Sequence, residues 1–144
     1  MFLSLISATA GEVFTYIGYI LLAVVAIMVM IVVHELGHYL AGKLFKFKID
    51  EFGIGFGPPI FKRVSKKTGE KFTLRPIPLG GFCAFHGEDE DEGEDEGAYN
   101  RQKPWKRLIV LFSGAFFNFL SAIFIITIYF TAYGQILPVV TDSY

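Results

Sequence analysis

Residues 13–38 decide the fold, and they read VFTYIGYILLAVVAIMVMIVVHELGH. The first 21 of them, residues 13–33, carry no charge. A membrane-spanning helix needs about 20 apolar residues, whereas continuous apolar runs in buried soluble helices seldom exceed about 14. A signal peptide would be shorter and would follow a basic segment, but no Lys or Arg precedes Val13. We therefore predict an uncleaved spanning helix over residues 13–45, after an outer tail over residues 1–12.

A second uncharged run of 33 residues extends from Leu108 to Val140 and predicts a spanning helix over residues 108–138. The chain is 53% hydrophobic, and its mean hydropathy is +0.48. Soluble domains are about 45–50% apolar even with glycine counted. The composition therefore argues against a soluble domain and favours a mainly α membrane protein. We expect two transmembrane helices joined by a cytoplasmic loop that contains a membrane-associated β-hairpin.

The distribution of charge predicts the orientation in the membrane. All 13 Lys and Arg residues lie between Lys43 and Arg107, in the connection between the two apolar runs. The two outer flanks carry only Glu12 and Asp142. Because cytoplasmic loops are enriched in Lys and Arg, we expect residues 46–107 in the cytoplasm and the N-terminus outside.

The loop divides into two parts. Within residues 46–87, alternating runs at 47–50 and 71–75 flank a turn at 66–70, which predicts the β-hairpin. The Pro and Gly residues over 76–81 are expected to end its second strand. Residues 88–107 form an acidic and then basic linker. Its first nine residues include eight acids, which favours a solvated segment, with a regulatory or metal-buffering role as the alternative.

His34, Glu35 and His38 form an H-E-x-x-H motif at the end of the first apolar run. Residues four apart share one face of a helix, so both imidazoles can reach one metal ion. Zinc binds imidazole nitrogen and activates water, and Glu35 beside the first ligand is the predicted catalytic base. Ionisable residues after such an apolar run mark a functional site by default.

A catalytic zinc site uses three protein ligands, and the motif supplies two. His86 is expected to be a solvated loop residue, and Asp50 and Glu51 are expected to be strand residues, although each is a candidate third ligand. Cys83 is the single cysteine, so no intrachain disulfide is possible. We interpret it as a small packing residue.

Several segments together resemble the site-2 protease family, most closely its regulator-of-sigma-E type. The segments are spread over most of the chain: VHELGHYLAGK at 33–43, FGIGFGP at 52–58, IPLGGF at 77–82 and SGAFFN at 113–118. The last is similar to the Gly-x-x-x-Asn helix start of that family.

The resemblance implies an intramembrane zinc metalloendopeptidase in a bacterial inner membrane, crossing it more than once. Such enzymes cut membrane-spanning substrates, such as anti-sigma factors, after an earlier cut by another protease. The implied partners are therefore a transmembrane protein substrate and membrane lipid, without nucleic acid. The loop would bind the unwound substrate as an added strand. Asn118 would help to position the substrate or the hairpin near zinc, with helix packing as the alternative. Gly114 is a second candidate at the substrate, although close approach of the helices is the favoured interpretation of this glycine.

Two departures from the family pattern limit this reading. Ala115 replaces the usual proline, and the sequence contains no Asp-Gly dipeptide, although the family takes its third ligand from a Leu-Asp-Gly motif on a later helix. We expect a truncated N-terminal part, with residues 139–144 beginning a PDZ-like region. A missing C-terminal half would supply the Asp ligand and the PDZ domain, so the chain alone would be inactive. The alternatives are a non-catalytic membrane substrate-binding module and a channel or transporter fragment, which leaves the motif unexplained.

Overall fold

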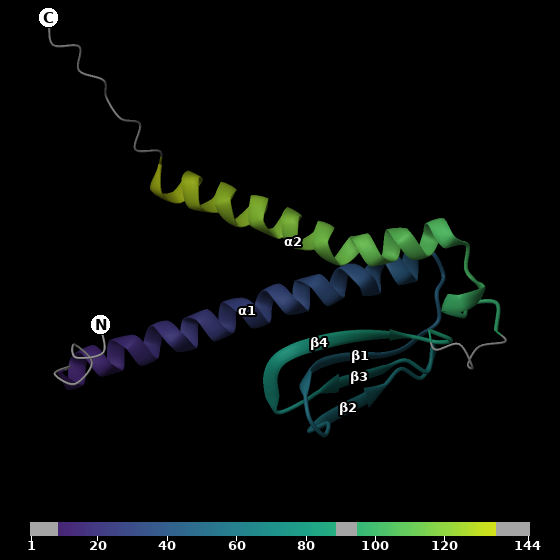
Figure 1. Cartoon of the computed structure of the whole chain (residues 1–144), viewed down its shortest axis with the longest axis horizontal. Coiled ribbons are helices and arrows are strands. Elements are labelled where there is room, and N and C mark those ends of the chain that lie inside the picture. Colours follow the sequence, from purple (N-terminus) through teal and green to yellow (C-terminus); the bar gives the residue numbers. More distant parts are fainter. Residues whose placement is uncertain (1–8, 89–94, 135–144) are drawn as a thin grey trace, which may run out of the picture.

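The computed structural model describes residues 9–88 and 95–134. Two long helices meet near one end of the molecule and diverge toward the other, and a small sheet lies against the first helix (Figure 1). The order of elements is α1 (Ala10–Leu44), β1 (Ile49–Phe56), β2 (Phe61–Val64), β3 (Lys71–Leu74), β4 (Ile77–Phe85), η2 (Tyr99–Arg101) and α2 (Pro104–Tyr133). Two long apolar helices and a small β-sheet therefore make up the described part of the chain.

Helix α1 begins at Ala10, before the predicted start at residue 13, because Thr9 and Glu12 form a capping box. The Thr9 hydroxyl accepts from the Glu12 backbone N–H, and the Glu12 carboxylate accepts from the Thr9 backbone N–H at 2.7 Å. This exchange satisfies backbone donors that the first helical turn leaves unpaired. The helix ends at Leu44, and Lys46 with φ 63° turns the chain back toward the sheet. The predicted outer tail, residues 1–12, lies mostly outside the described residues.

Helix α2 begins at Pro104, ahead of the predicted start at 108, because proline at the first helical position needs no N–H partner. Its first turn carries Lys106 and Arg107, so the helix begins before the uncharged run. It ends at Tyr133 with Gly134 as its C-cap, and the predicted end at 138 lies beyond the described residues. Both α1 and α2 are long and apolar enough to cross a membrane.

The sheet has the strand order β2-β3-β1-β4. The predicted hairpin between runs 47–50 and 71–75 is wrong, because β1 and β3 are parallel neighbours and a hairpin pairs its strands antiparallel. Strand β3 pairs antiparallel with β2 around the turn at 65–70, and it pairs parallel with β1. The Pro- and Gly-rich segment, expected to end a strand, forms the nine-residue strand β4. Pro78 is compatible with β4 because this is an edge strand, where an N–H need not be paired within the sheet.

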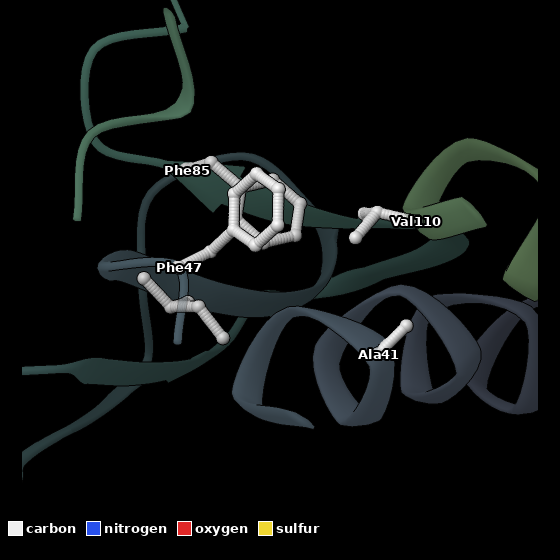
Figure 2. Packing of buried hydrophobic residues seen from close by; sticks show 5 residues of the cluster. Ala41, Phe47, Phe85 and Val110 are labelled. Carbon is white, nitrogen blue, oxygen red and sulfur yellow. The ribbon is translucent and has the colours of Figure 1, made fainter. Parts of the chain in front are cut away.

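A small apolar cluster joins the helices to the sheet. Phe47 and Phe85 pack edge to face with ring centroids 5.6 Å apart, and Ala41 of α1 and Val110 of α2 belong to the same cluster (Figure 2). Ile49 at the start of β1 belongs to the same cluster and is 2% exposed. The cluster therefore fixes the end of α1, the start of α2 and the sheet to one another, close to the motif.

A buried carboxylate makes a second connection between α1 and the sheet. Glu70, next to the start of β3, is 5% exposed and forms an ion pair with Lys43. It also accepts a hydrogen bond from the Tyr39 hydroxyl at 3.3 Å. The Tyr39 ring packs edge-on against Phe52 and Phe72, with centroids 5.5 and 5.9 Å away. The last turns of α1 are thereby held against β1 and β3.

Candidate metal centre

The two histidines of the motif point at one place on α2. A Cβ atom built on Gly114 would lie 2.5 Å from Nε2 of His38 and 2.6 Å from Nε2 of His34. Such distances leave no room for a side chain, so glycine is required while both imidazoles keep this orientation. The two Nε2 atoms therefore converge in a space that Gly114 leaves free, as two ligands of one metal ion must.

A backbone carbonyl on α2 sets the tautomer of His38. Nδ1 of His38 lies 2.7 Å from the carbonyl oxygen of Val110, which can only accept a hydrogen bond. Nδ1 therefore carries the proton, and Nε2 keeps the lone pair that a metal needs. A metal-binding histidine usually donates its second ring N–H in this way, which fixes the orientation of its ring.

Asn118, one helical turn beyond Gly114, lies beside the other histidine. Its side-chain amide is 3.3 Å from Nδ1 of His34. The oxygen of the same amide, Oδ1, is buried and has no hydrogen-bond partner among the described residues.

A close crossing of the helices brings α2 this near to the motif. A Cβ atom on Gly37, within the motif itself, would lie 2.6 Å from the carbonyl oxygen of Ser113. Gly37 and Gly114 thus face each other across the crossing, as small residues do where helices in membranes approach closely. Gly37 gave no functional signal in the sequence, because it occupies one of the two unspecified positions of the motif.

Glu35 lies between two cavities and beside the edge strand. One cavity, of about 360 Å³, is lined by Glu35, His38 and residues of β4 and α2, and the other, of about 380 Å³, by Ile27, Met30, Ile31, His34, Glu35 and Asn118. A Cβ atom on Gly81 of β4 would lie 3.0 Å from Cγ of Glu35. The Glu35 side chain therefore packs against β4 at Gly81.

The candidate third ligands from the sequence do not reach this place. His86 pairs with Asp50 at 3.0 Å and lies 3.6 Å from Asp95. Both of these partners lie in the connection between the two helices and not in the motif. Glu51 is engaged by Thr73 at 2.6 Å and by Arg75 at 3.0 Å. Among residues 9–88 and 95–134, no group of three His, Cys, Asp or Glu side chains is placed to hold a metal ion.

Two pKa values near the site have clear physical causes. Burial, reinforced by the negative charge of Glu35, raises the pKa of the Cys83 thiol to about 12, so the thiol stays protonated at neutral pH. Burial alone would raise the pKa of Glu51 as well. The hydrogen bonds from Thr73 and Arg75 and the charge of Arg75 outweigh this effect and hold the pKa of Glu51 below its usual value.

Comparison with known proteins agrees with this geometry. The family model described as "Peptidase family M50" matches residues 22–142. The chain belongs to this family, the site-2 proteases. The matched range of the M50 model includes the whole motif, the sheet and α2.

Several similar bacterial proteins carry the name "Putative zinc metalloprotease". One from Fusobacterium nucleatum is 41% identical over 116 residues, 81% of this chain and 33% of the relative. One from Clostridium perfringens is 42% identical over 108 residues, 74% of this chain and 31% of the relative. One from Helicobacter pylori is 37% identical over 129 residues, 85% of this chain and 36% of the relative. The chain thus spans about a third of the length of the curated relatives it matches.

Proposed function

We propose that this chain is the N-terminal part of an intramembrane zinc metalloendopeptidase that cleaves membrane-spanning substrates. The observation that carries the proposal is the convergence of Nε2 of His34 and Nε2 of His38 over Gly114, with Glu35 between them in the sequence. Membership of a peptidase family with relatives named for zinc supports the same reading.

His34 and His38 would hold the zinc ion. When bound, zinc supplies Lewis-acid activation of water and of a peptide carbonyl. Glu35 acts as general base, because its carboxylate lines both cavities and borders the strand along which a substrate would lie. A residue outside this chain completes the ligand set, by resemblance an Asp of a Leu-Asp-Gly motif. The isolated chain is then expected to bind zinc weakly and not to cleave.

The substrate would add to the sheet as a strand along β4. Strand β4 is an edge of the four-stranded sheet, and its Gly81 lies against Glu35. An added strand gains main-chain hydrogen bonds without regard to sequence, which suits an unwound helix as substrate. Regulated intramembrane proteolysis, such as the cleavage of an anti-sigma factor, is the setting we propose.

The proposed location is the bacterial inner membrane, crossed more than once, with the sheet on the cytoplasmic side. His34 lies 20 residues after Phe14, which is about 30 Å along a helix. The metal centre would therefore lie near the cytoplasmic boundary of the hydrocarbon layer, where water can enter from the cytoplasm.

The proposal is tested with Glu35→Gln in the complete protein that contains this chain. Cleavage of a membrane-spanning reporter substrate should fall to background, while bound zinc measured by elemental analysis stays near one equivalent per protein. Glu12→Gln is the matched control, because Glu12 lies on the same helix and Gln also serves in a capping box. Unchanged cleavage by Glu35→Gln would refute the proposed role of Glu35. Zinc bound without any cleavage by the unmodified protein would favour the non-catalytic module.

A further inference from the structure

The two histidines differ in what holds them. His38 donates to a backbone carbonyl, that of Val110, which no substitution removes. The group next to Nδ1 of His34 is a side chain, the amide of Asn118. The orientation of His34 therefore depends on the residue type at position 118, whereas that of His38 depends on the helix backbone.

The Asn118 amide has two possible orientations with opposite consequences for His34. With the amide nitrogen toward His34, Nδ1 would have to accept, so Nε2 would carry the proton and have no lone pair to offer. With the oxygen toward His34, Nδ1–H donates to Oδ1, and Nε2 is free. The oxygen and nitrogen of an amide are assigned from the hydrogen-bond network. Since Oδ1 has no partner in the first orientation, the second gives this buried acceptor a donor, and the amide nitrogen then takes the position without a protein partner among the described residues.

We propose that Asn118 is a positioning residue, whose side-chain oxygen accepts Nδ1–H of His34 and so makes Nε2 the metal-binding nitrogen. Both histidines then have the same tautomer, with both unprotonated Nε2 atoms beside Gly114. The inference rests on the proposed function to the extent that the site binds zinc. It replaces the expectation that Asn118 acts by contacting substrate.

Zinc affinity tests the inference, measured by competition with a chelator in detergent-solubilised complete protein. Asn118→Leu, which has similar size and no acceptor, should weaken zinc binding by about 10–100-fold, as loss of such partners usually does. Asn118→Asp keeps an acceptor and should retain affinity within a few-fold. Thr127→Val is the matched control on α2, because the Thr127 hydroxyl donates within its own helix to the carbonyl oxygen of Ile123. The zinc affinity of this variant should be unchanged.

Wild-type affinity in Asn118→Leu with a raised KM would overturn the inference and restore the substrate-contact role. Equal losses in the Leu and Asp variants would overturn it as well, because the acceptor would then be irrelevant.

A second measurement needs no variant of Asn118. Nitrogen-15 spectra of histidine-labelled, metal-free protein should show His34 protonated at Nδ1, assigned by the loss of its signals in His34→Phe. Protonation at Nε2 would contradict the inference directly. Neither the zinc affinity nor the nitrogen-15 spectrum depends on cleavage. The role of Asn118 can therefore be decided even if the Glu35→Gln test fails.

Discussion

Gly114 meets two structural requirements that no other residue type can meet together. Its missing side chain lets α2 cross close to the motif helix, and it leaves free the space toward which both Nε2 atoms point. The sequence indicated a helix contact or a substrate contact at this position. Neither the H-E-x-x-H spacing nor the apolar pattern of α2 could predict that the two histidines face this glycine, because the relative rotation of two helices is set by packing.

Gly114→Ala should separate metal binding from stability. Alanine is favoured over glycine within a helix by about 1 kcal/mol, so the helix itself gains. The added methyl group nevertheless occupies the space beside both Nε2 atoms, so zinc affinity should fall about 10-fold or more, comparable to the loss of a supporting group. Chelator competition measures the affinity, and Ala115→Ser on the exposed neighbouring position is the control. Full affinity in Gly114→Ala would show that the imidazoles bind metal in another orientation.

At the scale of elements, the docking of the sheet on α1 depends on polar contacts as well as on the apolar cluster. Glu70 appeared in the sequence as part of a turn, yet it is buried and bound to Tyr39 and Lys43. No local pattern distinguishes such a carboxylate from a solvated one, because its partners lie about 30 residues earlier in the chain.

Glu70→Leu should loosen β3 from the motif helix. The substitution leaves the Lys43 ammonium and the Tyr39 hydroxyl without their acceptor, at a cost of about 1–3 kcal/mol for a buried polar contact. Hydrogen exchange of the β3 amides should become correspondingly faster, while the amides of α2 keep their protection. Lys71→Leu serves as control, since the Lys71 side chain next to Glu70 is exposed. Equal exchange in wild type and Glu70→Leu would mean that the apolar cluster alone holds the sheet.

Glu51 predicts how the sheet responds to acid. Its folded-state pKa lies below the ordinary value of 4.5, so its contribution to stability is present above that value. The contribution is lost as the pH falls through the folded pKa, when Thr73 and Arg75 lose the carboxylate. Amide exchange in β1 and β3, corrected for its intrinsic pH dependence, should accelerate below about pH 4.5. Glu51→Gln should remove this pH dependence, and identical profiles for the two proteins would contradict the assignment.

The sequence supported the helices better than the sheet, for a physical reason. Each helix follows from local information, namely an uncharged run, the Thr9–Glu12 capping box and Pro104 at a helix start. The parallel pairing of β1 with β3 joins residues about 20 positions apart and leaves no alternation that identifies the partner. For the candidate site, the sequence predicted the residues His34, Glu35 and His38. It could not predict the supporting carbonyl of Val110, because every residue type carries the same backbone acceptor.

At the scale of the whole molecule, the cations of the loop set the orientation that we propose. Lys66 and Lys67 lie exposed at the turn between β2 and β3, so trypsin can reach them without unfolding the sheet. Brief digestion of inside-out membrane vesicles should cleave the chain at this turn, and right-side-out vesicles should be spared. Detergent-permeabilised right-side-out vesicles provide the control for protease activity. Cleavage in intact right-side-out vesicles would place the sheet outside the cytoplasm.

The supports of the motif histidines have a consequence for biosynthesis. Every described group that orients His34 and His38 comes from the chain up to Asn118. A nascent chain that has inserted α1 and α2 therefore already contains these groups. Under the proposed function, the remaining ligand comes from a segment made afterwards. A partly synthesised protease would then hold metal poorly and could not attack its neighbours in the membrane, so the order of synthesis itself would delay activity until assembly is complete.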